Sequence, residues 1–304
     1  MKRILDCQAS DFADMDGVDL KNSIRAGEGR TILSECIVSW TPLLRDVSNP
    51  EVARSCGADL VLLNFFDVDN PEIQGLPGST GEDVVRELKK LTGRPVGINL
   101  EPVDVEAVMV DEKIDIPAGR MLSKRTVERV VELGFDFVCV TGNPKTGVTN
   151  REIATGVRTI RACAGDKLLV IAGKMHAAGT EVSWTEASLA ELSETFVTAG
   201  ADVVLLPAPG TVPGVDYLIL RPAVQRAHAL GALVILAIGT SQEGADVQTI
   251  RQIALQSKMT GADILHLGDA GTLGMAEPNN IIAASDALRG RRHTLRRMAT
   301  SPLR

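Results

Sequence analysis

One short pattern of apolar and polar positions occurs four times along the chain. Each copy begins with a glycine, continues with a small or aromatic residue and an aspartate, and ends in an apolar run. An apolar run of this length between turn residues predicts a strand buried on both faces, as in a parallel sheet. The glycine is suited to end the preceding helix, because it adopts a left-handed conformation without steric cost. The copies cover residues 57–64, 134–141, 200–207 and 261–268.

A second set of apolar runs alternates with these copies, and most of the intervening stretches are predicted helices. Eight strands that alternate with helices are typical of an α/β protein of the (β/α)8 type, in which the copies would form the even strands. A doubly wound open sheet is the alternative, but it gives no reason for the repeat. We predict a single (β/α)8 TIM barrel over 31–290, an N-terminal extension, 1–30, that closes its bottom, and a basic C-terminal tail, 291–304. The additional runs cover residues 31–38, 94–100, 167–173 and 232–239.

Capping residues delimit several of the helices. Ser123 and Thr185 are suitable N-caps, and Asn49 followed by Pro50 is a suitable start for the first barrel helix. The predicted helices cover 49–56, 82–91, 123–133, 150–164, 185–198 and 215–230, and another begins at 246. The longest loop, 102–122, has the length of a lid over a site, and an insertion or a contact between subunits is equally consistent with it.

Composition and charge narrow the functional classes. Hydrophobic residues make up 44% of the 304 residues and aromatic residues 3%, which suits an aliphatic barrel core. The net charge of −7 argues against nucleic acid or an anionic membrane as the main partner. The five cysteines have no CxxC spacing, and there is no signal peptide or bilayer-length apolar run. We therefore expect a cytoplasmic protein, a homo-oligomer, whose partner is a small metabolite.

The last sixteen residues, 289–304, contain six arginines and one histidine. A nucleic-acid-binding tail is one interpretation. We favour the solvated end of the last helix, because cations stabilise a helix C-terminus.

Side chains alternate across a strand, and this alternation predicts which positions face the barrel interior. In every copy the second and fourth residues after the aspartate are apolar, so this face should pack on the helices. The other face then places polar side chains at the carboxyl ends of the strands, where barrel enzymes have their active sites. The repeated aspartates lie at the opposite end and are interpreted as turn residues without a catalytic role. The predicted interior layers are Leu62, Cys139, Leu205 and His266, followed at the mouth by Asn64, Thr141, Pro207 and Gly268.

The odd strands supply the remaining candidates. On the third strand Asn99 and Glu101 should point inward, and on the fifth Lys174 and His176 share one parity and should both reach the mouth. An ammonium and carboxylates in one funnel are costly to bury without a partner or ligand. We predict that Lys174 is a base or an electrostatic anchor, and that His176 and Glu101 share proton transfer.

Glycine-rich segments follow the seventh and eighth strands, where many barrels bind phosphate through backbone amides. The predicted substrate-binding residues are Asn64, Asn99, Thr141, Asn143, Gly239, Thr240, Ser241, Gly268, Asp269 and Gly271. Asp269 and Glu243 would repel an anion unless a cation intervenes. Asp67 and Glu101 could hold such a cation, a divalent ion such as Mg²⁺, although no metal-binding spacing supports a motif.

Two segments resemble the BtpA family of (β/α)8 barrel proteins, which is named for photosystem I biogenesis. They are Val140-Thr-Gly-Asn-Pro-Lys-Thr-Gly147 after the fourth strand and Val170-Ile-Ala-Gly-Lys-Met-His-Ala177 at the fifth. That family has a Thr-Gly pair and a Lys-His pair there, and this chain departs from it by placing Met175 between Lys174 and His176. The resemblance implies a barrel with a small-molecule site.

The sequence therefore predicts an enzyme that acts on a phosphorylated or carboxylated metabolite, with lyase or isomerase chemistry on a sugar phosphate or an oxo acid. A metal-assisted enzyme is one alternative. A non-catalytic, BtpA-like binding or assembly factor is another, because this fold supports many unrelated functions.

Overall fold

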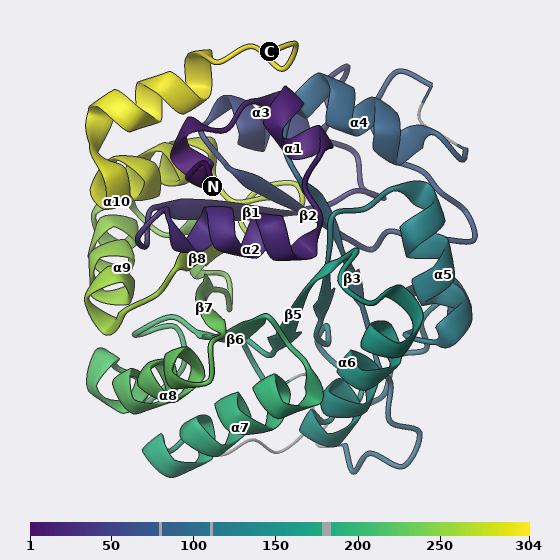
Figure 1. Ribbon diagram of the computed structural model, residues 1–304, viewed down its shortest axis with the longest axis vertical. Helices are drawn as coiled ribbons and strands as arrows, with labels where there is room; N and C mark the ends of the chain where they lie inside the picture. The colour runs from purple at the N-terminus through teal and green to yellow at the C-terminus, as the bar shows by residue number, and fades with distance from the viewer. Residues whose placement is uncertain (79–80, 110–111, 178–183) are drawn as a thin grey trace.

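Eight parallel strands close into a barrel in which each strand pairs with the next and β1 pairs with β8 (Figure 1). The computed structural model describes residues 1–78, 81–109, 112–177 and 184–304. The predicted fold class is confirmed, and the four sequence copies form the even strands. The strands are β1 Thr31–Ile37, β2 Leu60–Asn64, β3 Val96–Leu100, β4 Phe137–Val140, β5 Leu169–Gly173, β6 Val203–Pro207, β7 Leu233–Ile238 and β8 Ile264–Leu267.

The helices that cover the barrel begin and end close to their predicted bounds. Ser123 and Thr185 are N-caps as predicted, each accepting a hydrogen bond from the first turn. The cap of the first barrel helix is Ser48 rather than Asn49, because Ser48 and Glu51 form a capping box. The covering helices are α3 Asn49–Ser55, α4 Val84–Thr92, α5 Lys124–Leu133, α6 Asn150–Ala164, α7 Glu186–Ala199, α8 Tyr217–Ala229, α9 Val247–Thr260 and α10 Pro278–Ala299. No helix in the described part of the chain combines the length and apolar composition needed to span a membrane.

The predicted alternation of side chains divides the core into two shells. Val61, Val138 and the equivalent residues of the other strands pack outward against the helices. Leu62, Cys139 and Leu205 pack inside the barrel, as predicted. The inner shell is small and aliphatic for most of its depth, so polar side chains can gather only where it ends.

The N-terminal segment packs against the inner shell at the amino ends of the strands. It contains η1 Ile4–Asp6, α1 Ala9–Ala13 and α2 Gly17–Arg25. Leu20 and Ile24 of α2 belong to the same apolar cluster as Leu33 inside the barrel. Figure 1 shows this segment in purple, with α2 lying across the strands. Domain bounds at residues 30 and 290 remain a prediction.

Each repeated aspartate fastens its strand to the preceding odd strand. The carboxylate of Asp59 accepts a hydrogen bond from the backbone N–H of Ile32, and the N–H of Asp59 donates to the carbonyl oxygen of Ile32. All four reciprocal pairs have N···O distances between 2.8 and 3.0 Å. These residues therefore do more than form turns, because they extend the hydrogen bonding of the sheet beyond its strands. The other pairs are Asp136 with Val96, Asp202 with Val170 and Asp263 with Val234.

Asp59 differs from the other three in the burial of its cationic partners. Its carboxylate lies 2.5 Å from Nη1 of Arg289 and 2.7 Å from Nε of Arg297, and all three side chains are buried. The backbone leaves the helical conformation at Gly290, with φ 77°, so that α10 (yellow in Figure 1) bends there. The expectation of a solvated helix end is therefore wrong for Arg289 and Arg297, because the bent helix brings both to Asp59.

We predict that Asp59→Asn destabilises the protein by about 3–5 kcal/mol, because it leaves buried guanidinium groups without their anion. The amide oxygen can still accept the hydrogen bond from Ile32. The matched control is Asp263→Asn, whose partner His228 is 39% exposed and which should cost at most about 1 kcal/mol. Urea unfolding of both variants measures the difference. Equal losses would show that the buried charge is not what distinguishes Asp59.

Candidate functional site

A cavity of about 160 Å³ opens at the carboxyl ends of the strands. Residues from the ends of β1, β2 and β3 line one side, and the loops after β4, β5, β7 and β8 line the rest. The predicted site residues that line it are Asn64, Asn99, Thr141, Asn143, His176, Thr240, Ser241 and Asp269. The structure thus brings most of the predicted substrate-binding residues together.

Three carboxyl groups converge on this cavity, from Glu35, Glu243 and Asp269. Glu35 and Glu243 are buried almost completely. Burial, reinforced by the negative charges of Glu35 and Glu243, raises the pKa of Asp269 well above its usual range. Burial likewise raises the pKa of Glu243. Asp269 and Glu243 therefore keep their protons to higher pH than ordinary carboxyl groups and can act as proton donors.

The partners of these carboxyl groups are incomplete. Asn99 Nδ2 donates to Glu35 Oε1 at 2.5 Å, and His266 Nε2 lies 3.0 Å from Glu35 Oε2. Glu243 Oε1 accepts from the backbone N–H of Ala270, but Glu243 Oε2 has no hydrogen-bond partner among the described residues. Asn99 Oδ1 is buried and equally unsatisfied within that part of the chain. A buried polar atom without a partner costs about 1–3 kcal/mol, so these atoms favour a polar ligand or solvent in the cavity.

A chain of hydrogen bonds connects Asp269 to the outer edge of the mouth. Asn64 Nδ2 donates to Asp269 Oδ2 at 2.7 Å and to Asn143 Oδ1 at 2.8 Å. Asn143 donates both its side-chain amide and its backbone N–H to Glu101, each at 2.9 Å. Arg120 Nη2 then lies 2.7 Å from Glu101 Oε1. Glu101 is therefore placed behind the cavity wall, where it orients Asn143.

Aromatic side chains continue this chain at the rim. The guanidinium of Arg120 stacks 4.2 Å from the ring centroid of Phe65, and Trp40 packs edge-on against Phe65 at 6.3 Å. Trp40 is half-exposed and Phe65 has a left-handed backbone, with φ 59°. Strain of this kind in a non-glycine residue is frequent at functional sites. The rim thus presents an aromatic face beside the polar cavity.

Lys174 does not line the cavity, so the prediction that it reaches the mouth is wrong. Ile171 of β5 packs inside the barrel and Ala172 outside it, so the parity of Ala172 leads away from the mouth. Lys174 instead lines a separate small cavity beside Trp184 and Leu192. Its ammonium donates to the carbonyl oxygens of Val148 and Ala177, and burial lowers its pKa to about 8. The strand ends at Gly173, and beyond it the alternation no longer applies.

His176 and Met175 both line the cavity once the strand has ended. Burial lowers the pKa of His176, which favours the neutral imidazole near pH 7. Met175 lies over Gly239, where a Cβ atom would come within 2.5 Å of the methionine sulfur. The methionine that interrupts the Lys-His pair thus fills space at the mouth, and a larger residue at position 239 would have to displace its side chain.

The predicted phosphate-binding glycines shape the loops without lining the cavity themselves. A Cβ atom at Gly268 would lie 2.7 Å from Glu243 Oε1, and one at Gly271 would lie 2.6 Å from the carbonyl oxygen of Met275. Thr240 and Ser241 have positive φ angles of 58° and 70° and line the cavity between these loops. Whether they bind phosphate remains a prediction.

The two predicted metal ligands have separate partners. Asp67 accepts hydrogen bonds from the backbone of Asp69 and the side chain of Asn70, whereas Glu101 is held by Arg120 and Asn143. Within the described ranges, no group of three or more His, Cys, Asp or Glu side chains is placed to hold a metal ion.

The sequence predicts no catalytic or binding role for two of the three cavity carboxyl groups, Glu35 and Glu243. Glu35 follows Leu33 by two positions on β1, and Leu33 packs inside the barrel, so the alternation of this strand could have placed Glu35 inward. Glu243 lies in the short 3-10 helix η3, Gln242–Gly244, where no periodicity applies. The pairing of β7 with β8 brings it next to the end of β8.

Comparisons with known proteins identify the fold. The sequence model of one family, described as "Domain of unknown function (DUF7916)", matches residues 5–304. No curated protein matches the sequence. An archaeal fructose 1,6-bisphosphate aldolase is 15% identical, with a TM-score of 0.51 over 86% of this chain and 94% of the aldolase. A Schiff-base-forming fructose-1,6-bisphosphate aldolase is 16% identical, with a TM-score of 0.50 over 90% and 93% of the two chains. At this identity the likeness shows the shared barrel alone, and neither the family model nor these two structures are specific to the BtpA family.

We predict that Asp269→Asn becomes increasingly more stable than the wild type as the pH rises above about 4, where an unfolded aspartate ionises. Because the folded state raises the pKa of Asp269, it favours the protonated form and loses stability as the pH rises through that pKa. The gain should grow by at most about 1.4 kcal/mol per pH unit and then level off. Urea midpoints from pH 4 to 9 test this, with the 73% exposed Asp83 as Asp83→Asn for a control. A gain independent of pH would contradict the assignment.

Proposed function

This chain belongs to the DUF7916 family, and we propose that its barrel is an enzyme that transfers protons on a small metabolite bound at the mouth. The observation that supports this most is the convergence of Glu35, Glu243 and Asp269 on one cavity. Packing alone gives no reason to bury three acidic groups together, because their mutual repulsion and desolvation are unfavourable. Active sites are where such costs are usually found.

The proposed roles follow from the protonation each group favours. Asp269, whose pKa is raised, is the general acid that donates to a substrate oxygen. His176, whose pKa is lowered, accepts the proton removed from the substrate. Asn64 holds Asp269, and Glu101 acts through Asn143 as a positioning residue. Lys174 has no assigned contact with the ligand.

We assign the reaction to the lyase or isomerase class. Proton donation to a carbonyl oxygen, with proton removal at the neighbouring carbon or hydroxyl, is common to enolisation, isomerisation and aldol cleavage. A sugar phosphate or an oxo acid provides such a carbonyl. The amide and hydroxyl groups of Asn64, Thr141 and Ser241 suit a substrate with several oxygen atoms. A protonated Asp269 would also donate to an anionic oxygen rather than repel it.

A phosphate group would lie against the loops after β7 and β8. Thr240 and Ser241 line the cavity there, in the part of the fold where many barrels bind phosphate. The described lining contains no lysine or arginine, so recognition would come from backbone amides and neutral side chains. The two aldolases, named for a phosphorylated sugar, are compatible with this proposal without establishing it.

We predict that a panel of sugar phosphates, matched unphosphorylated sugars and oxo acids contains a compound that raises the melting temperature. At a hundredfold excess over its Kd, a ligand of the folded state adds about 2.7 kcal/mol of stability. The discriminating variant is Lys174→Met, which should keep the response, because Lys174 lies outside the cavity lining. Loss of the thermal shift in Lys174→Met would show that Lys174 contributes to ligand binding and contradict its placement outside the site. No response across the panel would favour a BtpA-like binding or assembly factor.

We also predict that Asp269→Asn lowers turnover of the identified substrate by about 10²–10⁴-fold, the range expected for loss of a general acid. The affinity of the variant for the substrate should change far less, because Asn64 can still donate to the amide oxygen of the introduced asparagine. Steady-state kinetics and direct binding separate the two effects. A variant that keeps full turnover would rule out Asp269 as the acid.

A further inference from the structure

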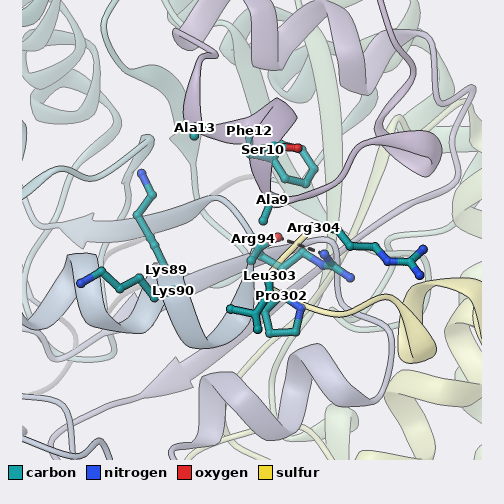
Figure 2. A pocket seen from close by; sticks show the side chains of 11 residues that line it. Ala9, Ser10, Phe12, Ala13, Lys89, Lys90, Arg94, Pro302, Leu303 and Arg304 are labelled. Carbon is teal, nitrogen blue, oxygen red and sulfur yellow. Dashed lines mark hydrogen bonds between the residues drawn. The ribbon is translucent and has the colours of Figure 1, made fainter.

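A second cavity, of about 370 Å³, lies at the amino ends of the strands, opposite the mouth (Figure 2). It lies between α1, the end of α4 and the last residues of the chain. The backbone N–H of Ser10 donates to the carbonyl oxygen of Arg304 at 2.9 Å, which holds the two ends of the chain together beside it. Its volume is near the lower end of the range of about 300–1,000 Å³ that is usual for small-ligand sites.

The lining of this bottom pocket is mainly apolar. Phe12 is buried at its inner side, and Ala9, Pro302 and Leu303 complete the apolar surface. Leu303 is 90% exposed, so a large apolar side chain at the rim has nothing to cover it among the described residues. An apolar ligand would remove this surface from water, which is favourable at about 25 cal/mol per Å².

Positive charge lies directly behind the apolar lining. Arg94 lines the pocket and is buried, and its guanidinium donates to the carbonyl oxygens of Ala58, Gly93 and Arg297 rather than to a carboxylate. The nearby Asp59 already pairs with Arg289 and Arg297. Three buried guanidinium groups therefore lie in a region where Asp59 is paired with two of them and Arg94 contacts only backbone carbonyl oxygens.

The pKa of Arg94 is consistent with this excess of buried positive charge. Burial, together with the positive charge of Arg297, lowers the pKa of Arg94 to about 9. Figure 2 shows Lys89, Lys90 and Arg304 around the same pocket. Lys89 and Lys90 pair with Asp136 and Glu87, so they add little net charge of their own. The buried arginines are thus the main source of the uncompensated charge.

We propose that the bottom pocket binds an amphiphilic anion, a medium-chain carboxylic acid whose chain occupies the apolar lining and whose carboxylate faces Arg94. A carboxylate there supplies the negative charge that the buried arginines lack, and Arg guanidinium groups suit carboxylates better than any other anion-binding side chain. A cationic amphiphile could bury its chain against the same apolar surface, but its positive head group would be repelled by the buried arginines. The proposal is independent of the chemistry at the mouth.

Isothermal titration calorimetry of the full chain with butyrate, octanoate and octylamine tests the ligand class. Octanoate should bind, and affinity should increase by up to about fourfold per methylene between butyrate and octanoate, as expected for burial of the chain. Octylamine has the same chain and the opposite charge, and it should bind at least tenfold more weakly. Equal binding of octanoate and octylamine, or no binding of octanoate, would overturn the proposal.

A matched pair of variants at an exposed position locates the site. Leu303→Glu and Leu303→Lys remove the same apolar side chain and differ only in charge, and neither should affect folding. We expect Leu303→Glu to bind octanoate at least fivefold more weakly than Leu303→Lys. Asp269→Asn, at the mouth, should bind it as the wild type does. Identical affinities in the Leu303 pair, or a loss in Asp269→Asn, would place the ligand elsewhere and overturn the assignment.

Discussion

The reciprocal hydrogen bonds between the four repeated aspartates and the odd strands are the constraint on which the rest of the structure depends. Each aspartate both accepts a hydrogen bond from and donates one to the same residue of the neighbouring strand, as Asp59 does with Ile32, so each fixes one strand against its neighbour. Side chains alternate with a period of two, and a slip of one residue would exchange the inner and outer shells. The polar layer at the mouth therefore depends on contacts at the opposite end of the barrel.

The two ends of the barrel have opposite electrostatic character. Glu35, Glu243 and Asp269 are crowded together at the mouth. At the bottom, Arg289 and Arg297 share the carboxylate of Asp59, and Arg94 donates only to backbone carbonyl oxygens. The aliphatic inner shell between them contributes no compensating charge. At each end, burying groups of like charge is unfavourable, and a bound ligand can reduce this cost. Because the charges have opposite signs, the two ends favour different ligands. Proton-accepting oxygen compounds suit the mouth, and carboxylates suit the bottom.

Much of the site could be predicted wherever strand alternation applied. Asn64, Asn99 and Thr141 lie at the mouth because they occupy inward positions on a regular strand or, for Thr141, directly after one. The prediction failed for Lys174, because the parity of β5 was assigned from Ala172, which faces outward. It also gave Glu243 no role in the site, since a residue in a loop has no period that shows where its side chain points. Arg297 was mistaken for a solvated cation, because the bend of α10 at Gly290 is not visible in the composition of the tail.

The amino-acid sequence by itself determined the eight strands, their order and the inner and outer faces of the four even strands. These features depend on local periodicity and on a pattern that occurs four times. Only the tertiary structure decided which charged groups meet. Glu35, Glu243 and Asp269 come from β1 and from the loops after β7 and β8, and the closing of β8 against β1 brings them together. Spatial proximity between distant segments follows from closure of the barrel, which no local pattern specifies.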